Sequence, residues 1–251
     1  METKISLDEA YDLACSFEAK EQVIGIQKEK ILHKTLKYYL CPDDTKHEIK
    51  ITKENKGVLY ADILLDNVIY EIQTRSFNAL RNKLNEFLKQ HQVIVVYPIA
   101  YIKQITNVSN ENTILSNKKS PKKGNPLEIF VELYKIKDFL KNSNLGFKIF
   151  LLDMDEYRKI TTKKHYRSSG YVRLVQIPKK IEKEINLINK YDYYELLKNY
   201  NFSNSFTSSD FSKITHLNTR KSRITLNVLT YLEIVKRVGK TGNSYIYEIT
   251  K

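Results

Sequence analysis

Cysteine is scarce in this sequence, tryptophan is absent, and long apolar runs are missing. The two cysteines, Cys15 and Cys41, form no CxxC motif and no disulfide framework. No apolar run approaches the ~20 residues that a membrane-spanning helix needs. The first residues, METKISLDEAYDLACSF, are acidic and amphipathic, and have neither the basic start nor the apolar block of a signal peptide. We therefore expect a soluble protein in a reducing, cytoplasmic setting, with no membrane partner.

Several common functional motifs are also missing. The sequence has no Gly-rich phosphate loop, GxSxG elbow, HExxH helix or Cys/His zinc spacing, and no internal repeat. What it has instead is positive charge: 42 Lys and Arg against 29 Asp and Glu give a net charge of +13. This excess favours nucleic acid as a partner first and an anionic membrane surface second. The Lys-, Asn-, Ile- and Tyr-rich composition also fits an AT-rich genome, so the charge alone does not decide.

The most informative stretch is Tyr60 to Thr74, YADILLDNVIYEIQT. It contains two short apolar strands joined at Asp66-Asn67, a pair that favours the tight turns of two-residue hairpins. Folding the stretch at that turn fixes which residues face each other across the hairpin. The expected pairs are Leu65 with Val68, Leu64 with Ile69, Ile63 with Tyr70, and Asp62 with Glu71.

Asp62 and Glu71 therefore meet directly across the hairpin, and Gln73 shares their face. Two carboxylates placed opposite each other destabilise a sheet. At a separation of ~5 Å and an effective dielectric constant of ~20, the repulsion is about 3 kcal/mol. Such a pair is tolerated if a cation binds between the two acids, if they share a proton, or if they splay into solvent. The leading interpretation is a bound cation.

The rest of the chain up to residue 205 reads as alternating helices and strands. Ser76 caps a helix that connects the hairpin to an apolar strand, which predicts a right-handed strand–helix–strand crossover. Glu29 and His33 lie four residues apart on the flank of the first helix, and for His33 the ordinary expectation is a solvated position. The expected elements are helices at 8–40, 76–88, 127–140 and 177–200, and strands at 47–52, 92–97 and 147–152.

Two basic segments interrupt these elements. Residues 115–125, LSNKKSPKKGN, are expected to form a loop that either contacts phosphates or is simply solvated, with equal weight. Its lysines are Lys118, Lys119, Lys122 and Lys123. Residues 161–173, TTKKHYRSSGYVR, are basic with interleaved tyrosines, and we expect them to lie along a nucleic-acid channel.

The last segment, residues 206–251, has the pattern helix, turn, helix, two strands, and resembles a winged helix-turn-helix. It holds eight basic and three acidic side chains, a net charge of +5. Apolar residues of its second helix supply the packing, which leaves polar residue types to face DNA; a winged helix used for protein contacts is the less favoured alternative. The expected DNA-binding residues are Thr219, Arg220, Ser222, Arg223 and Asn227 on the helix, and Lys236, Arg237 and Lys240 on the hairpin.

The order of a Glu-bearing helix, a strand, an Asp-bearing strand, a Glu-x-(Lys/Glu/Gln) strand, a helix and a strand resembles the PD-(D/E)XK nuclease superfamily. The resemblance covers roughly Glu18 to Tyr97 and implies a restriction-endonuclease-like mixed sheet flanked by helices. It makes Asp62 and Glu71 metal-binding acids, the Ile72 carbonyl a further ligand and Glu29 the helix acid. The implied cofactor is Mg²⁺ or Mn²⁺.

Gln73 departs from this family's pattern, because a lysine usually stands there. Lys83 is our choice for the replacement cation, with Arg75 and Lys50 as alternatives. Ala61 replaces the proline of the family name, a minor change. The chain is also similar to bacterial proteins of unassigned function.

These features predict an α/β protein in three parts: a nuclease-like domain at 1–160, a basic helical connector at 161–205 and a small winged helix at 206–251. The expected function is a Mg²⁺-dependent endonuclease acting on double-stranded DNA. The alternative is a DNA-binding regulator whose nuclease-like domain lost catalysis at Gln73. A membrane-surface or RNA-binding scaffold is a third, weaker hypothesis. A restriction-like role would imply a homodimer, although no sequence feature encodes one.

Overall fold

The computed structural model describes residues 5–20, 31–53, 57–109, 111, 113–160 and 170–250, with side chains of residues 17–20 not described. These residues divide into two compact units. Unit 1 comprises Met1–Thr74, Val96–Asn125 and Ile149–Glu184; unit 2 comprises Arg75–Val95, Pro126–Lys148 and Ile185–Lys251. The boundaries expected from the sequence, at residues 160 and 205, divide the chain consecutively, whereas these units are assembled from segments that alternate along it.

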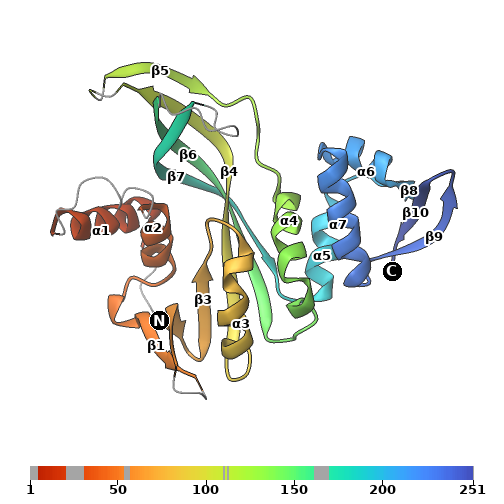
Figure 1. Ribbon diagram of the computed structural model, residues 1–251, viewed down its shortest axis with the longest axis horizontal. Helices are drawn as coiled ribbons and strands as arrows, with labels where there is room; N and C mark the ends of the chain where they lie inside the picture. Colours follow the sequence, from red (N-terminus) through yellow and green to blue (C-terminus); the bar gives the residue numbers. More distant parts are fainter. Residues whose placement is uncertain are drawn as a thin grey trace. The chain divides into compact units, whose positions relative to one another are not determined.

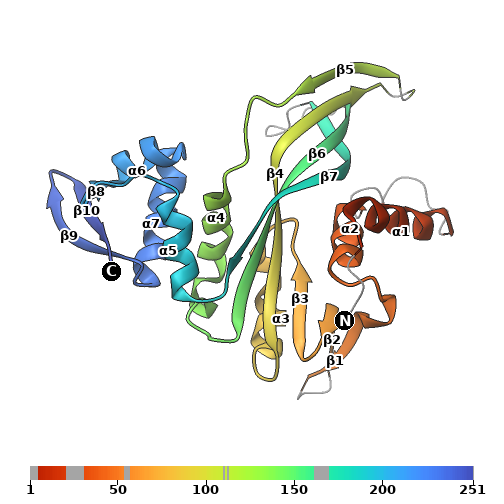
Figure 2. The same ribbon diagram turned by 180° about the vertical axis from the view of Figure 1, so that it is seen from behind.

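A large sheet of mixed topology, flanked by helices, makes the protein mixed α/β (Figures 1 and 2). Its strand order is β1-β2-β3-β4-β6-β7, and β5 pairs with β4. Strands β4, β6 and β7 contribute residues to both units. The strands are β1 (His47–Thr52), β2 (Val58–Leu65), β3 (Val68–Ile72), β4 (Gln92–Val108), β5 (Ile114–Lys119), β6 (Leu145–Ile160) and β7 (Tyr171–Leu187).

The β2–β3 hairpin has the register that the sequence predicts. Ile63 pairs with Tyr70, Leu64 with Ile69, and Leu65 with Val68. Asp66 and Asn67 both have positive φ, 43° and 66°, as a tight primed turn requires. Asn and Asp tolerate this left-handed region better than other side chains, so the turn chemistry and the register agree.

The predicted strand–helix–strand crossover is confirmed. Ser76 caps η3 (Phe77–Leu80), which continues into α3 (Arg81–Phe87), and the chain returns as β4 beside β3. Both strands point the same way in Figure 1. Residues 93–96 of β4 are all buried, as expected for a strand covered on both faces.

The core of unit 1 lies between the sheet and α2 (Ile31–Leu40), which follows α1 (Leu7–Lys20). Tyr39 of α2 meets Phe150 of β6 edge to face, with ring centroids 5.7 Å apart. Burying one large apolar side chain contributes about 1.5–3 kcal/mol, so this cluster anchors α2 firmly on the strands that carry the acid pair. Its buried members are Leu32, Leu36, Cys41, Ile63, Ile72, Val96, Phe150, Leu152 and Met154.

Unit 2 contains a second, three-stranded sheet of order β8-β10-β9 and several short helices. The helix expected at 127–140 is divided into three pieces, with a non-helical residue at Ile136. Residues 206–250 follow the predicted order of helix, turn, helix and hairpin. The elements are η4 (Pro126–Glu128), α4 (Ile129–Leu133), η5 (Tyr134–Phe139), α5 (Lys190–Lys198), β8 (Phe206–Thr207), α6 (Ser208–Thr215), α7 (Thr219–Tyr231), β9 (Val235–Thr241) and β10 (Ser244–Ile249).

Two predicted elements are wrong. Residues 177–187 belong to strand β7 and not to a helix; only 190–198 are helical. Ile181 and Ile185 are four residues apart, which is the spacing of one face of a helix. In the structure β7 is an edge strand of the sheet. Pro178 is tolerated there, because a residue on the outer side of an edge strand needs no backbone hydrogen bond. The loop expected at 115–125 begins as strand β5, which forms an antiparallel hairpin with the preceding end of β4, in which Val108 pairs with Ile114 and Gln104 with Lys119. None of the helices in the described ranges is long and apolar enough to cross a bilayer.

Candidate functional site

The predicted acid pair lies where the β2–β3 ladder ends. Ile63 and Tyr70 form the last backbone pair of this ladder, and Asp62 and Glu71 come next. The Asp62 N–H donates to Glu71 Oε1 at 3.1 Å, and the Ile72 N–H donates to Asp62 Oδ2 at 2.8 Å. Each carboxylate therefore accepts an N–H from the opposite strand. The pair is buried, with 8% of Asp62 and 2% of Glu71 exposed.

Helix α2 adds a histidine to this pair. His33 Nε2 lies 3.1 Å from Asp62 Oδ2, so the same oxygen meets both the imidazole and the Ile72 N–H. The sequence interpretation placed His33 in solvent and is wrong on this point. The residue borders Leu32 and Leu36, which pack into the core, and this brings its ring to the rim of the acid pair.

A second ion pair lies one helical turn further along α2. Lys37 is buried and pairs with the carboxylate of Glu48 on β1. The β1–β2 register, His47 with Ile63 and Ile49 with Ala61, places Glu48 opposite Asp62. Glu48, Asp62 and Glu71 therefore occupy one level of three adjacent strands. Sequence reasoning did not single out Lys37 or Glu48.

The donor set at this level fits one type of metal ion better than another. Among the described residues, no group of three or more His, Cys, Asp or Glu side chains is arranged to hold a metal. Structural zinc sites are built mostly from Cys and His ligands, whereas this level of the sheet offers carboxylates. Mg²⁺ usually keeps several waters beside one or two carboxylates, and Asp62 with Glu71 supplies two. Glu29, the expected third acid, lies outside the described residues.

The remaining nuclease-site predictions have no direct test in these contacts. Gln73 is half-buried, and its backbone N–H donates to the Val96 carbonyl of β4 at 2.9 Å. Lys50 pairs with Tyr60, two residues before Asp62 on β2. Lys83 lies on α3 in unit 2. The role of the Ile72 carbonyl stays a prediction.

Five of the expected DNA-binding residues belong to α7, which packs against α6, α4 and η5. Thr219, Arg220 and Arg223 are exposed, as predicted. Ser222 is fully buried and its hydroxyl donates to the Asn218 carbonyl, so the expectation that it faces DNA is wrong. Asn227 is half-buried, and its amide oxygen accepts from Lys137 Nζ of η5 at 2.9 Å.

The β9–β10 hairpin presents its three predicted basic residues to solvent. Lys236 lies 3.4 Å from Glu248 across the hairpin. Arg237 and Lys240 both lie over the ring of Tyr245, at 4.2 and 4.7 Å from its centroid. The tyrosine holds these two cations on one side of the hairpin.

The four lysines at 118–123 are exposed as well. Lys118 and Lys119 lie on β5, and Lys122 and Lys123 follow it. Lys123 lies 4.1 Å from the ring centroid of Tyr101 on β4. Most of the basic segment 161–173 lies outside the described residues.

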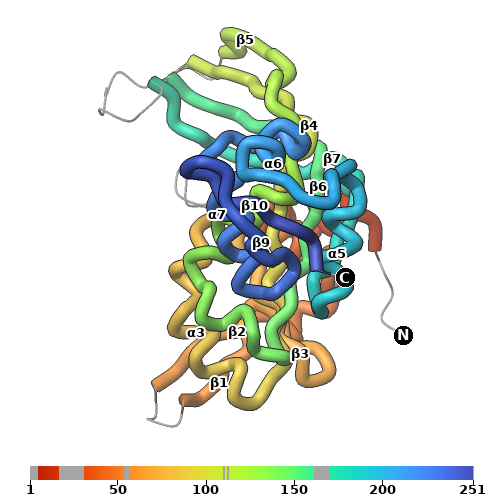
Figure 3. Tube along the Cα trace, turned by 90° about the vertical axis from the view of Figure 1, so that its right-hand side faces the viewer, coloured from red at the N-terminus to blue at the C-terminus, as the bar shows by residue number. Residues whose placement is uncertain are grey.

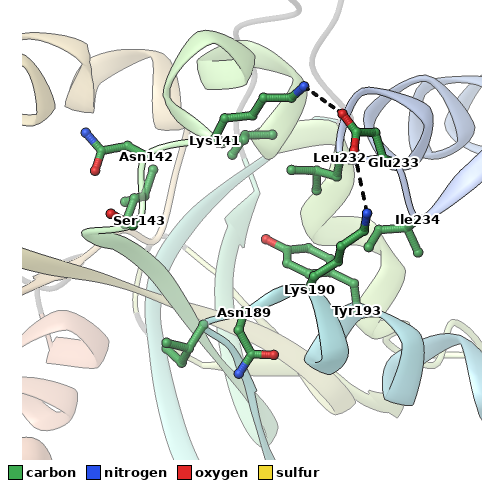
Figure 4. Close-up of a pocket in the computed structure, with 12 residues that line it drawn as sticks. Lys141, Asn142, Ser143, Asn189, Lys190, Tyr193, Leu232, Glu233 and Ile234 are labelled. Atoms are coloured by element: carbon green, nitrogen blue, oxygen red, sulfur yellow. Dashed lines mark hydrogen bonds and ion pairs between the residues drawn. The ribbon is translucent and has the colours of Figure 1, made fainter.

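A cavity of about 360 Å³ in unit 2 was not anticipated from the sequence. Figure 4 shows Lys141 and Lys190 pointing at the Glu233 carboxylate on its wall. The distances are 3.1 and 3.6 Å. Tyr193 lines the same cavity, and burial raises the pKa of its hydroxyl. Because both lysines already have a carboxylate partner, we interpret these ion pairs as structural contacts that link the ends of η5, α5 and α7.

Together these observations define a mixed α/β protein with a buried acid pair where two central strands diverge. The chain belongs to the family described as a domain of unknown function, DUF8091, whose family model matches residues 30–188. That range includes α2, the acid pair and strands β1 to β7 completely.

An uncharacterized protein of Treponema pallidum (strain Nichols) is 30% identical over 126 residues, which is 50% of this chain and 49% of that protein. The chain thus spans about half the length of this curated relative. No solved structure matches the chain significantly.

Proposed function

We propose that this protein is a metal-dependent DNA endonuclease whose C-terminal segment is a winged helix that binds duplex DNA. The observation that carries the proposal is the burial of Asp62 and Glu71 side by side where the β2–β3 ladder ends. The element order α2, β1, β2, β3, α3, β4 supports it, since it resembles the restriction-endonuclease-like core.

In this proposal Asp62 and Glu71 hold a Mg²⁺ or Mn²⁺ ion, with the Ile72 carbonyl as a further ligand. A bound ion of this kind makes hydroxide available for attack and neutralises charge that develops on the phosphate. His33 fixes the orientation of the Asp62 carboxylate through its contact with Oδ2. Lys37 pairs with Glu48, so this neighbouring third acid already has a cation partner of its own.

Gln73 cannot supply the positive charge of the usual lysine. Lys83 remains our choice for that cation, with Arg75 and Lys50 as the alternatives from the sequence. Lys37 is a fourth alternative that the structure adds, although its pairing with Glu48 makes it less available. Comparison of Lys83→Gln and Lys37→Gln cleavage rates separates the two, because only loss of the required cation slows cleavage.

The direct test is plasmid cleavage with Mg²⁺ or Mn²⁺, comparing the wild type with Glu71→Gln. We expect the wild type to cut and Glu71→Gln to lose at least about 100-fold in rate, since loss of an outer-shell partner alone costs 10–100-fold. Glu111→Gln removes the same charge at an exposed loop and should cut normally. Equal cleavage by the wild type and Glu71→Gln would overturn the proposal.

The winged-helix part of the proposal draws on the order α5, β8, α6, α7, β9, β10 and on the exposed Arg220 and Arg223. Arg220→Ala and Arg223→Ala should each weaken duplex binding and make it less salt-dependent. Arg81→Ala is the matched control, since Arg81 pairs with Asp138 on the exposed surface of unit 2. Unchanged affinity in both α7 variants would count against DNA delivery by this segment.

A second candidate is a DNA-binding regulator without catalysis. It is favoured by Gln73 and by the backbone N–H groups that already engage both acids. For a regulator, the wild type and Glu71→Gln would bind DNA alike and neither would cut.

A further inference from the structure

A second buried carboxylate in unit 1 has a different environment. Glu156 of β6 is 1% exposed and is surrounded by hydrogen-bond donors from its own strand and from the neighbouring strands β4 and β7. We define the Glu156 cluster by its members and their closest distances to that carboxylate: Lys103 Nζ at 3.0 Å, Arg158 Nε at 2.5 Å, Gln176 Nε2 at 2.9 Å and Arg173 Nε at 3.5 Å.

Positive charge exceeds negative charge in this cluster. Burial alone would raise the pKa of Glu156, but hydrogen bonds and charge from Lys103, Arg158 and Arg173 outweigh it and hold the pKa below its usual value. The carboxylate is therefore ionised at neutral pH, and three cations face one anion. One cation would suffice to neutralise Glu156, and the additional two repel each other and the first.

The three cations also reach solvent. The exposed fractions of the Lys103, Arg158 and Arg173 side chains are 21%, 29% and 44%. A cluster that served only to stabilise the sheet would need matched charge, because every charge that is taken out of water without a partner costs free energy. Partly exposed cations anchored at one end on a buried acid are instead preorganised for an external anion, because their rotamers are already fixed.

Further lysines lie on the same side of the sheet as Lys103. Tyr101 and Ile105 are each two residues from Lys103 on β4, so their side chains share its face. Lys118 of β5 is paired directly with Ile105 and so shares this face. Lys123 lies over Tyr101, and its charge also helps to lower the pKa of Glu182 on β7. Alternation along β6 turns Asp153 and Asp155 to the face opposite Glu156.

We propose that this face, made by β5, β4, β6 and β7, binds the phosphodiester backbone of a nucleic acid. Figure 3 shows these four strands side by side at the top of the view. The four strands are separated by three spacings of about 4.8 Å, so the face is ~14 Å wide. Along the helix axis, one nucleic-acid strand carries a phosphate charge every 3.4 Å or so, and a face of this width therefore spans about four phosphates. Arg158 and Arg173 present guanidinium groups that suit phosphate oxygens. The choice of nucleic acid rests on the proposed function.

The test is equilibrium binding of labelled 20-base-pair duplex DNA in EDTA, so that no cleavage occurs, across a range of salt concentrations. Arg173→Gln and Lys118→Gln are the principal variants, because Lys118 makes no contact with Glu156 and Arg173 makes the longest one. Each should weaken binding about 5-fold at 0.15 M salt and reduce the salt slope by ~0.9, the effect of one phosphate contact. Lys89→Gln, which removes one cation from an exposed pair with Glu86, should bind as the wild type does.

Glu156→Gln tests the positioning role of the carboxylate. It removes the one negative charge of the cluster and so raises the net charge by one. If the surface acted only through its charge, the variant would bind DNA more tightly than the wild type. We expect weaker binding by the folded variant, because Lys103 and Arg158 lose the anchor that orients them. Single-stranded DNA and RNA of the same sequence, measured in parallel, show which nucleic acid this face prefers.

Wild-type affinity and salt slope in both Arg173→Gln and Lys118→Gln would overturn the inference. Its failure is distinguishable from failure of the proposed function. Weaker binding by these variants without any metal-dependent cleavage by the wild type would support the phosphate-binding face and contradict the nuclease. Metal-dependent cleavage by the wild type together with unchanged DNA affinity of both variants would support the nuclease and contradict the phosphate-binding face.

Discussion

Two buried carboxylate sites in unit 1 differ in how their negative charge is balanced. Asp62 and Glu71 are two acids that meet backbone N–H groups and one histidine. Glu156 is one acid that meets three cations and an amide. The first site places two acids side by side, whereas the second surrounds one acid with three cations. The first is suited to bind a cation and the second to bind an anion.

This contrast matters because a metal-dependent phosphodiester hydrolase needs both kinds of site: one that binds a divalent cation and one that binds the phosphates of its substrate. It also predicts that neutralising an acid has opposite consequences at the two places. At Glu156 it removes the buried anion that compensates three partly exposed cations. At Asp62 and Glu71 it removes part of a repulsion that costs about 3 kcal/mol at ~5 Å and an effective dielectric constant of ~20.

The largest expected effect on stability is that of Glu156→Ala. Removing one partner of a buried ion pair costs 3–5 kcal/mol, and we expect about 3 kcal/mol because the three cations reach solvent. Urea unfolding measures it as a lower midpoint with an unchanged slope. Glu195→Ala is the control, since Glu195 forms an exposed pair with Lys198 and should cost less than ~1 kcal/mol. Equal losses in the two variants would remove the basis of the comparison.

The stabilisation by Glu156 should depend on pH. Its pKa is lowered in the folded state, so its contribution is present above the ordinary value of 4.5 and is lost as the pH falls through the folded-state pKa. At pH 7 the wild type should therefore unfold at a higher urea concentration than Glu156→Gln, and the two midpoints should converge below pH 4.5. A constant difference between them across this range would contradict the assigned charge state.

At the acid pair we expect the opposite sign. In EDTA, Glu71→Gln should be more stable than the wild type by about 1 kcal/mol, because relief of repulsion exceeds the loss of one charge-assisted hydrogen bond. Adding Mg²⁺ should raise the Tm of the wild type, with a gain of ~2.7 kcal/mol at 100 times Kd, and should not change that of Glu71→Gln. A thermal shift assay with and without Mg²⁺ measures both. Destabilisation in EDTA together with no Mg²⁺ response would mark the pair as purely structural.

Sequence reasoning succeeded where the determinants are local. Asp66 and Asn67 alone specify the turn, and the turn fixes the register that places Asp62 opposite Glu71. Thr207 and Asp210 form the capping box that starts α6. These features depend on residues within a few positions of one another, so one sequence contains all the information.

The errors arose where distant partners decide. His33 contacts Asp62 across 29 positions, and Lys103 contacts Glu156 across 53, so neither pairing is visible in a local pattern. Strand β5 is a different case, because its partner β4 directly precedes it in the chain and the two form a hairpin. Ser222 is an exception, since its burial was predictable: it lies four residues before Leu226 and seven before Leu229, both buried.

The smallest expected effect concerns Glu233, which also meets more than one cation but at the surface. Its ion pairs with Lys141 and Lys190 are exposed and worth 0–1 kcal/mol or so. Its φ of 60° lies in the left-handed region, which costs a non-glycine residue roughly 1–2 kcal/mol. Glu233→Gly removes both contributions and adds unfolded-state entropy of about 0.5–1 kcal/mol, so its stability should stay within ~1 kcal/mol of the wild type.

Glu233→Ala is the informative companion, because alanine loses the ion pairs but keeps the backbone strain. The glycine variant should therefore be at least as stable as the alanine variant in urea unfolding. A loss above ~2 kcal/mol in both would mean that this exposed carboxylate matters nearly as much as Glu156. Burial would then not explain why the two carboxylates differ in their contribution to stability. The excess of cations around Glu156 could also no longer be taken as a sign that it binds an external anion.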